Sequence, residues 1–188
     1  MVTAVIFDCF GVLTSDAWTP FKAAHFASNT ELFEEAESLS KQSDAGLISY
    51  ADFIEGVAAL AGMTYGEVRQ DIERNVANEP LLAYIKQLKP TYKIGLLSNA
   101  SANVLEMLFT AEQLQLFDVV AISYETGFVK PGERAFTDIA DKLAVPTEEC
   151  LLVDDVQRNC TAAKETGMQT ILYQNLDQTL TDLNQILK

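Results

Sequence analysis

The chain has 188 residues and a formal net charge of −14, from 13 basic and 27 acidic side chains. This excess of negative charge argues against nucleic acid and anionic membranes as partners, because both are bound by clustered Lys and Arg. Hydrophobic residues make up 48% of the chain, enough for a buried core, which argues against intrinsic disorder. The length allows one ordinary domain, or one domain with a modest insertion.

The start of the chain and its cysteines indicate a cytoplasmic protein. Asp8 ends the first apolar run after a few residues, and no basic segment precedes it, unlike a secretory signal. Cys9, Cys150 and Cys160 form neither an even set nor a Cys-x-x-Cys pair, which is typical of reduced thiols. No stretch approaches the roughly 20 apolar residues of a membrane-spanning helix. We therefore expect no membrane partner, and no pattern predicts an oligomeric state.

Short apolar runs recur at the start and through the second half of the chain. They are rich in Val, Ile and Leu without polar alternation, which is typical of strands buried on both faces of a parallel sheet. Helix-length segments separate the later runs, so we expect right-handed β-α-β crossovers in an α/β fold. The expected strands are residues 3–7, 94–97, 119–122, 150–153 and 170–173.

Two segments between and after these strands have the spacing of amphipathic helices. Pro131 suits the first turn of the earlier helix, where its missing N–H is not needed. The apolar positions are Ala135, Phe136, Ile139, Ala140 and Leu143 in the first helix, and Leu176, Leu180, Leu183 and Leu187 in the second.

Residues 15–80 break the alternation of strands and helices. They contain no convincing strand, but they show helical spacing, for example at Phe53, Ile54 and Val57. This segment holds 12 acidic and 4 basic residues, a net charge of −8 out of the total of −14. We predict an all-helical insertion at 15–80 in a core made of residues 1–14 and 81–188. Its acidity makes long polyanionic substrates an unfavourable match.

Polar residues follow four of the apolar runs. In open parallel sheets the ligand crevice lies at the carboxyl ends of the strands, so these residues are candidates for one shared site. Carboxylates bind Mg²⁺, while a metal ion, a lysine, a hydroxyl and backbone N–H groups can together hold a phosphoryl group. The residues are Asp8, Ser98, Asn99, Lys130, Asp154 and Asp155.

These motifs, in this order, resemble the haloacid dehalogenase-like hydrolase superfamily over essentially the whole chain. The first motif is VIFDCFGVLT at 5–14, the second LLSN at 96–99, the third VKPG at 129–132 and the fourth LLVDDVQRN at 151–159. Each motif alone is weak, but four in order at strand ends form a specific signal. The resemblance implies a Rossmann-like core with a helical cap at 15–80.

The resemblance implies that the carboxylates carry catalysis and metal binding. Asp8 is then the nucleophile that forms a covalent aspartyl intermediate, and it also ligates Mg²⁺. Asp154 and Asp155 are further Mg²⁺ ligands, together with the backbone carbonyl of Phe10. The alternative for two adjacent acids is a helix N-terminal cap. The implied cofactor is Mg²⁺, and the implied reaction is hydrolysis of a small phosphorylated metabolite.

Ser98, Asn99 and Lys130 are the implied phosphoryl-binding residues. Ser98 contacts the phosphoryl group through its hydroxyl, Asn99 through its backbone or amide, and Lys130 pairs with both Asp8 and the phosphoryl group. The alternatives are a Ser-Asn turn that closes a strand and a solvated surface lysine. Asn159 lies four residues after the second acid of its motif, where its amide either faces the site or lies on the exposed side of a helix.

Four other residues have simpler interpretations. Gly11 allows the backbone to turn sharply after the nucleophile. Successive strand residues face opposite ways, so Cys9, which follows Asp8, is expected to be a core thiol rather than a second nucleophile. His25 and Trp18 are expected to pack within the cap.

Phe10 departs from the family pattern. Phosphatases of this superfamily usually carry an aspartate two residues after the nucleophile, which protonates the leaving oxygen and then activates water. Phenylalanine cannot transfer a proton, and a positioned acid-base group contributes roughly 10² to 10⁴ in rate. We therefore expect a slow phosphatase, or one limited to good leaving groups, unless another residue supplies the proton. Asp16, at the start of the cap, is the nearest candidate.

Three alternative functions stay open. An aromatic residue at the position of Phe10 is similar to the 2-haloacid dehalogenase branch, but those enzymes hold their substrate with a cap arginine, whereas the first arginine here is Arg69. Phosphonate-cleaving relatives use a cap lysine, for which Lys22 and Lys41 are present, but they carry a small residue in place of Phe10. The third alternative is a catalytically weakened binding or regulatory protein.

Overall fold

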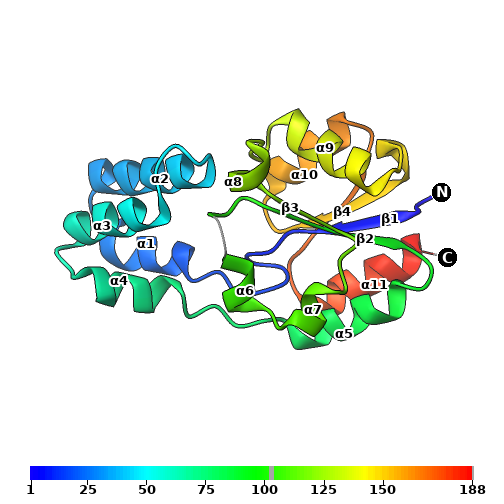
Figure 1. The fold of residues 1–188 in the computed structure, drawn as a ribbon, viewed down its shortest axis with the longest axis horizontal. Coiled ribbons are helices and arrows are strands. Elements are labelled where there is room, and N and C mark those ends of the chain that lie inside the picture. The colour runs from blue at the N-terminus through cyan, green and yellow to red at the C-terminus, as the bar shows by residue number, and fades with distance from the viewer. Residues whose placement is uncertain (102–103, 188) are drawn as a thin grey trace.

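The computed structural model describes residues 1–101 and 104–187. It places a parallel five-stranded sheet in the order β3-β2-β1-β4-β5, with helices on both faces (Figure 1). The predicted parallel α/β sheet is therefore confirmed, and each predicted strand lies within one residue of an observed one. The strands are β1 (Ala4–Phe7), β2 (Lys93–Ser98), β3 (Val119–Ile122), β4 (Cys150–Asp154) and β5 (Gln169–Leu172).

The register of the central strands brings the strand ends of the first, second and fourth motifs together. Phe7 pairs with Leu96 of β2 and with Val153 of β4, so Asp8 follows at the same level as the last residues of both neighbours. This is the edge of the sheet at which polar side chains from separate motifs meet.

Alternate residues of β1 face two different helical layers. Val5 and Phe7 belong to the core cluster with α5 (Glu79–Leu88) and α11 (Leu176–Ile186), whereas Ala4 and Ile6 pack with α9 (Glu133–Leu143) and α10 (Gln157–Glu165). In Figure 1 these two helix pairs lie on opposite faces of the sheet. The helices that follow the cap are α5 (Glu79–Leu88), α6 (Val104–Leu108), α7 (Ala111–Leu114), α8 (Ser123–Thr126), α9 (Glu133–Leu143), α10 (Gln157–Glu165) and α11 (Leu176–Ile186), with a 3-10 turn, η1 (Thr147–Glu149).

Both helices predicted from apolar spacing are present as α9 and α11. The expected position of Pro131 was wrong, because α9 begins at Glu133 after Gly132, and Pro131 precedes the helix behind a cis peptide bond. Leu187 lies one residue beyond the end of α11.

Among the described residues, every helix falls short of the length or the apolar character that a bilayer-spanning segment requires.

Residues between β1 and α5 fold as four helices with a hydrophobic cluster of their own. Ser49 and Thr64 begin two of these helices with capping boxes, in which Asp52 and Glu67 supply the reciprocal hydrogen bonds. Figure 1 shows this helical group beside the carboxyl end of the sheet. The helices are α1 (Trp18–Phe26), α2 (Thr30–Asp44), α3 (Tyr50–Ala61) and α4 (Tyr65–Ile72).

The two connections between cap and core are hydrogen-bonded to each other. The Ser15 N–H donates to the Val76 carbonyl at 2.9 Å, and the Asn78 N–H donates to the Leu13 carbonyl at 2.8 Å. Helix α5 begins at Glu79, so the predicted boundary after residue 80 falls within its first turn. The division into 1–14, 15–80 and 81–188 remains a prediction.

Candidate active site

A cavity of about 260 Å³ lies between the carboxyl ends of the strands and the cap helices. Its core side includes Asp8, Lys130 and Asp155, and its cap side includes Trp18 and Asp44. The cavity therefore joins residues of the first, third and fourth motifs to the insertion.

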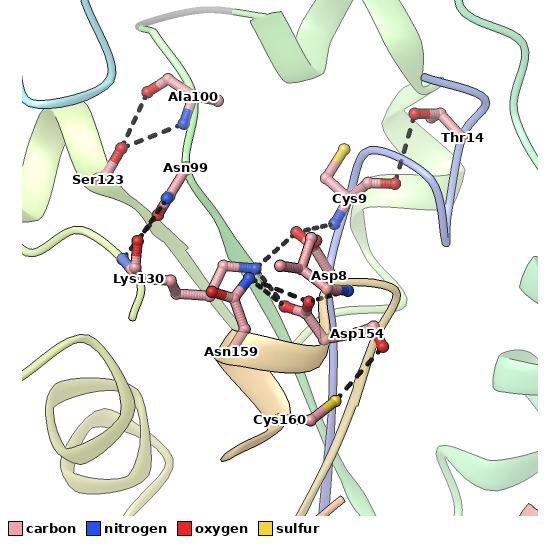
Figure 2. A network of polar contacts seen from close by, with 11 residues as sticks. Asp8, Cys9, Thr14, Asn99, Ala100, Ser123, Lys130, Asp154, Asn159 and Cys160 are labelled. Atoms are coloured by element: carbon pink, nitrogen blue, oxygen red, sulfur yellow. Dashed lines mark hydrogen bonds and ion pairs between the residues drawn. The ribbon is translucent and has the colours of Figure 1, made fainter. Parts of the chain in front are cut away.

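A buried lysine links two of the predicted carboxylates (Figure 2). The Lys130 ammonium lies 2.8 Å from Asp8 Oδ1 and 2.7 Å from Asp154 Oδ2. Lys130 is 3% exposed and Asp154 is fully buried, so these charges interact with little screening by water. Burial lowers the pKa of Lys130, but the Asp8 and Asp154 carboxylates raise it more, so the ammonium keeps its charge.

Asp154 is held by the helix that follows it. Asn159 Nδ2 donates to both Asp154 oxygens, at 3.0 and 3.1 Å, and the Val156 N–H donates to Oδ1 at 2.9 Å. Asn159 is buried, so the alternative of an exposed helix position does not apply. Its amide faces the site through Asp154, as Figure 2 shows.

Asn99 holds the backbone of Lys130. Its Oδ1 accepts from the Lys130 N–H at 2.8 Å, and its Nδ2 donates to the Lys130 carbonyl at 2.9 Å (Figure 2). Both ends of the amide are therefore occupied by protein, which favours a positioning role over the predicted contact between the Asn99 amide and a phosphoryl group. The lysine is thus fixed relative to the end of β2.

Ser98 ends β2 and is 1% exposed. Its Oγ is buried without a hydrogen-bond partner among the described residues. Because a buried hydroxyl without a partner is costly, this atom is a candidate for a bond to a ligand. Ser98 and Asp154 lie behind the residues that line the cavity surface.

Gly11 makes room for Asp155. Its φ of +83° is a conformation that favours glycine, as predicted, and a Cβ at this position would lie 2.3 Å from Asp155 Oδ2. Cys9, between Asp8 and this turn, is buried in the core, as expected of a structural thiol, and its N–H donates to Asp8 Oδ1 at 2.7 Å.

The three carboxylates of Asp8, Asp154 and Asp155 form a set that fits a divalent cation. Each offers an oxygen within 4.8 Å of the others. The pKa of Asp8 is raised to about 7 and that of Asp155 to about 6, mainly by burial and also by the nearby Asp154 charge, while Lys130 opposes these effects. An all-oxygen donor set with excess negative charge suits Mg²⁺, which would relieve this repulsion.

The aromatic ring of Phe10 occupies the cavity wall where the family pattern has an acid. Asp16 lines the same cavity, but its Oδ1 accepts from the Trp18 N–H at 2.9 Å and the Thr19 N–H at 3.3 Å. Trp18 packs edge-on against Phe53, as expected of cap packing, and its side chain also forms part of the cavity wall.

Asp44 and Arg158 are cavity residues that sequence reasoning missed. The pKa of Asp44 is raised to about 7, mainly by burial and also by the Glu37 charge, whereas Lys130 opposes this rise. Arg158 lies within the fourth motif, so its position offered a signal. Asp44 offered none, because it lies at the end of an ordinary amphipathic helix.

A family model described as haloacid dehalogenase-like hydrolase matches residues 2–167. "Phosphatase MT3486" of Mycobacterium tuberculosis (strain CDC 1551 / Oshkosh) is 25% identical over 95% of this chain and 90% of its own length. The D-ribitol-5-phosphate phosphatase of Bacteroides thetaiotaomicron is 27% identical over 93% of each chain. The crystal structure of a HAD family enzyme from Bacteroides thetaiotaomicron, in complex with magnesium and inorganic phosphate, superimposes with a TM-score of 0.75 at 22% identity, covering 93% of this chain and 95% of that one.

Proposed function

Because the chain belongs to the haloacid dehalogenase-like hydrolase family, we propose that it is a Mg²⁺-dependent phosphatase that acts on a small phosphorylated metabolite. The observation that carries this proposal is the buried set of Asp8, Lys130 and Asp154 beside Asp155, beneath a cavity open to the cap. Two similar proteins are named as phosphatases, which supports a phosphoryl substrate.

Asp8 is the proposed nucleophile. Its Oδ1 is held by the Lys130 ammonium and by the Cys9 N–H, which leaves Oδ2 to attack phosphorus. Lys130 neutralises negative charge on the phosphoryl group, and the unpartnered Ser98 hydroxyl donates to one of its oxygens. The alcohol of the substrate leaves as Asp8 becomes an acyl phosphate, and water then attacks phosphorus, which releases inorganic phosphate and restores the Asp8 carboxylate.

Asp8, Asp154 and Asp155 are the proposed side-chain ligands of Mg²⁺, with the Phe10 backbone carbonyl as a further ligand. When bound, the ion neutralises charge on the phosphoryl group and orients it. The magnesium and phosphate named for the similar Bacteroides structure support this choice of cofactor.

The cavity favours a substrate with one phosphoryl group and a small uncharged remainder. Its volume of about 260 Å³ suits a small molecule, and the carboxylates of Asp16 and Glu73 on its cap side repel a second anionic group. Trp18 and Phe53 supply an apolar wall beside these acids. A sugar or sugar-alcohol phosphate meets these demands, in line with the name of one relative.

The proposal is tested by measuring phosphate release from a panel of phosphomonoesters and acyl phosphates, with Mg²⁺ and with a chelator. Wild-type protein should release phosphate only with Mg²⁺, and Asp8→Asn should lower the rate by at least about 10³-fold, because no other group replaces the nucleophile. The exposed carboxylate of α9 provides a matched control, Asp141→Asn. Absence of release, or release that survives Asp8→Asn, would refute the proposal; halide release from 2-haloacids without metal would instead support dehalogenation.

We also place the protein in the cytoplasm, on the support of three buried cysteines that are all free thiols. The expectation that neither nucleic acid nor a membrane is a partner remains a prediction from the net charge.

A further inference from the structure

The proposed phosphatase lacks the aspartate that usually protonates the leaving oxygen, because Phe10 occupies that position. An alkoxide is a poor leaving group, so hydrolysis of an alkyl phosphate needs a proton donor in the cavity. Among the described cap residues, three carboxylates line this cavity: Asp16, Asp44 and Glu73.

Two of these carboxylates are engaged in the structure of the cap. Asp16 Oδ1 accepts hydrogen bonds from two backbone N–H groups at the start of α1. Glu73 Oε1 accepts from Arg69 Nε at 2.8 Å and from the Tyr50 hydroxyl at 3.3 Å. Within the described chain, the carboxylate of Asp44 makes neither a hydrogen bond nor an ion pair, and the residue is partly buried at the cavity.

The end of α2, where Asp44 lies, is hydrogen-bonded to the core. The Ser123 hydroxyl donates to the Asp44 backbone carbonyl at 2.5 Å. Next to it, the hydroxyl groups of Ser43 and Ser101 share a buried hydrogen bond of 2.6 Å. Figure 1 shows the end of α2 beside α8, the helix that begins with Ser123. These contacts fix the end of α2 beside the cavity that Asp44 shares with Asp8 and Lys130, and Asp44 is close enough for Lys130 to act on its charge.

We propose that Asp44 is the general acid and base of the reaction, in place of the missing aspartate at Phe10; this inference rests on the proposed phosphatase function. As Asp8 Oδ2 bonds to phosphorus and the bond from phosphorus to the leaving oxygen breaks, the Asp44 carboxyl gives its proton to that oxygen, and an alcohol leaves. Asp44, now a carboxylate, then accepts a proton from water as the water oxygen bonds to phosphorus. The bond from phosphorus to Asp8 breaks, phosphate leaves, and both carboxyl groups return to their starting states.

The surroundings of Asp44 suit proton transfer near neutral pH. The pKa of Asp44 is raised to about 7, mainly by burial and also by Glu37 on the same helix, while Lys130 from the core opposes both effects. Glu37 is itself paired with Lys22 of α1. A group whose pKa lies close to the working pH serves best as both acid and base.

The test compares two substrates that differ in their need for a proton. Acetyl phosphate has a leaving group that departs without protonation, whereas an alkyl phosphomonoester requires it. In single-turnover experiments with Mg²⁺, we expect Asp44→Asn to slow phosphorylation of Asp8 by the best alkyl substrate of the panel by about 10²-fold. Phosphorylation by acetyl phosphate should be nearly unchanged, and the phosphoenzyme should accumulate because its hydrolysis lacks a base.

Two further variants complete the design. Glu35→Gln removes an exposed carboxylate from the same helix and controls for loss of charge. Asp16→Asn tests the rival candidate in the same assay. Selective loss with the alkyl substrate in Asp44→Asn supports the inference. It is overturned if both substrates slow equally, if neither slows, or if only Asp16→Asn shows the selective loss. Wild-type protein that releases no phosphate from any substrate would refute the proposed function itself, so the two failures are distinguishable.

Discussion

The carboxylates at the core end of the cavity and Asp44 at its cap end differ in how they are held. At the core end, Lys130 lies within 2.8 Å of both Asp8 and Asp154, and Asn159 donates two further hydrogen bonds to Asp154. At the cap end, the Asp44 carboxylate lacks any such partner among the described residues. The pairing fixes Asp8 and Asp154 beside Lys130, whereas Asp44, whose pKa is raised to about 7, faces the cavity from the cap and can exchange its proton near neutral pH. The fold thus separates groups that hold the phosphoryl from a group suited to move protons.

The largest expected effect comes from removing the core cation. Lys130→Met leaves Asp8 and Asp154 buried without their counter-charge, and we expect the free energy of unfolding to fall by about 3–5 kcal/mol. Urea unfolding in the presence of a chelator measures it. Lys142→Met is the control, since Lys142 pairs with Asp138 at the surface and should lower stability by less than about 1 kcal/mol. An equal decrease in the free energy of unfolding in the two variants would show that the buried core pairing contributes no more than a surface ion pair.

A second effect is the contribution of the cap acid, Asp44, to the pH dependence of the free energy of unfolding. The pKa of Asp44 is raised to about 7 in the folded protein, so its contribution favours folding below pH 4 and is lost as the pH rises through 7. Asp44→Asn lacks this titrating group. Its free energy of unfolding should therefore decrease less between pH 4 and pH 8 than that of wild type, by on the order of 2–4 kcal/mol. Chemical denaturation across this range measures the difference. An unchanged pH slope would contradict the burial of this carboxylate, and Glu35→Gln serves as control.

A third change disturbs the core end without touching a charge. Gly11→Ala would place a Cβ 2.3 Å from Asp155 Oδ2, so we expect the affinity for Mg²⁺ to fall by about 10- to 100-fold. Calorimetric titration with Mg²⁺ measures this affinity. Gly127→Ala is a matched control, because Gly127 also has a positive φ of +72° but no atom within 4 Å of the added Cβ. Similar losses of affinity in both variants would point to backbone strain rather than contact with Asp155.

The smallest effect concerns the position of the missing acid. If Asp44 already carries the proton, Phe10→Asp adds a second donor and should raise kcat on alkyl phosphates by less than about tenfold. A gain of 10² or more, the usual contribution of a new acid-base group, would show that the wild-type site has no proton carrier. Steady-state rates on the best alkyl substrate of the panel decide between the two.

The core was predictable because its strands are buried on both faces. Short apolar runs such as residues 150–153 are stable mainly as central strands of a sheet. The observed β4 differs from this run only by including Asp154. The carboxyl ends of neighbouring parallel strands meet by geometry, so strand-end residues such as Asp8 could be placed together from sequence alone. Short elements such as α8 escaped prediction, because four residues are too few to show a helical period.

The cap side of the site could not be predicted in the same way. Asp44 reaches the cavity through tertiary contacts, such as the hydrogen bond between Ser43 and Ser101, which join residues 58 positions apart. No local pattern encodes such docking. The sequence pointed to Asn99 as a site residue but not to its hydrogen-bond partner. Its amide bonds the backbone of Lys130, 31 positions away. Side-chain partners of this kind depend on how loops pack once the sheet has formed.

The amide of Asn99 acts on the Lys130 backbone much as a neighbouring strand would, with one donor and one acceptor. The position of Lys130 is therefore fixed by the residue that follows β2, and not only by the segment that connects it to α8. The position of the charge that faces Asp8 therefore depends on a neutral side chain from the end of a different strand.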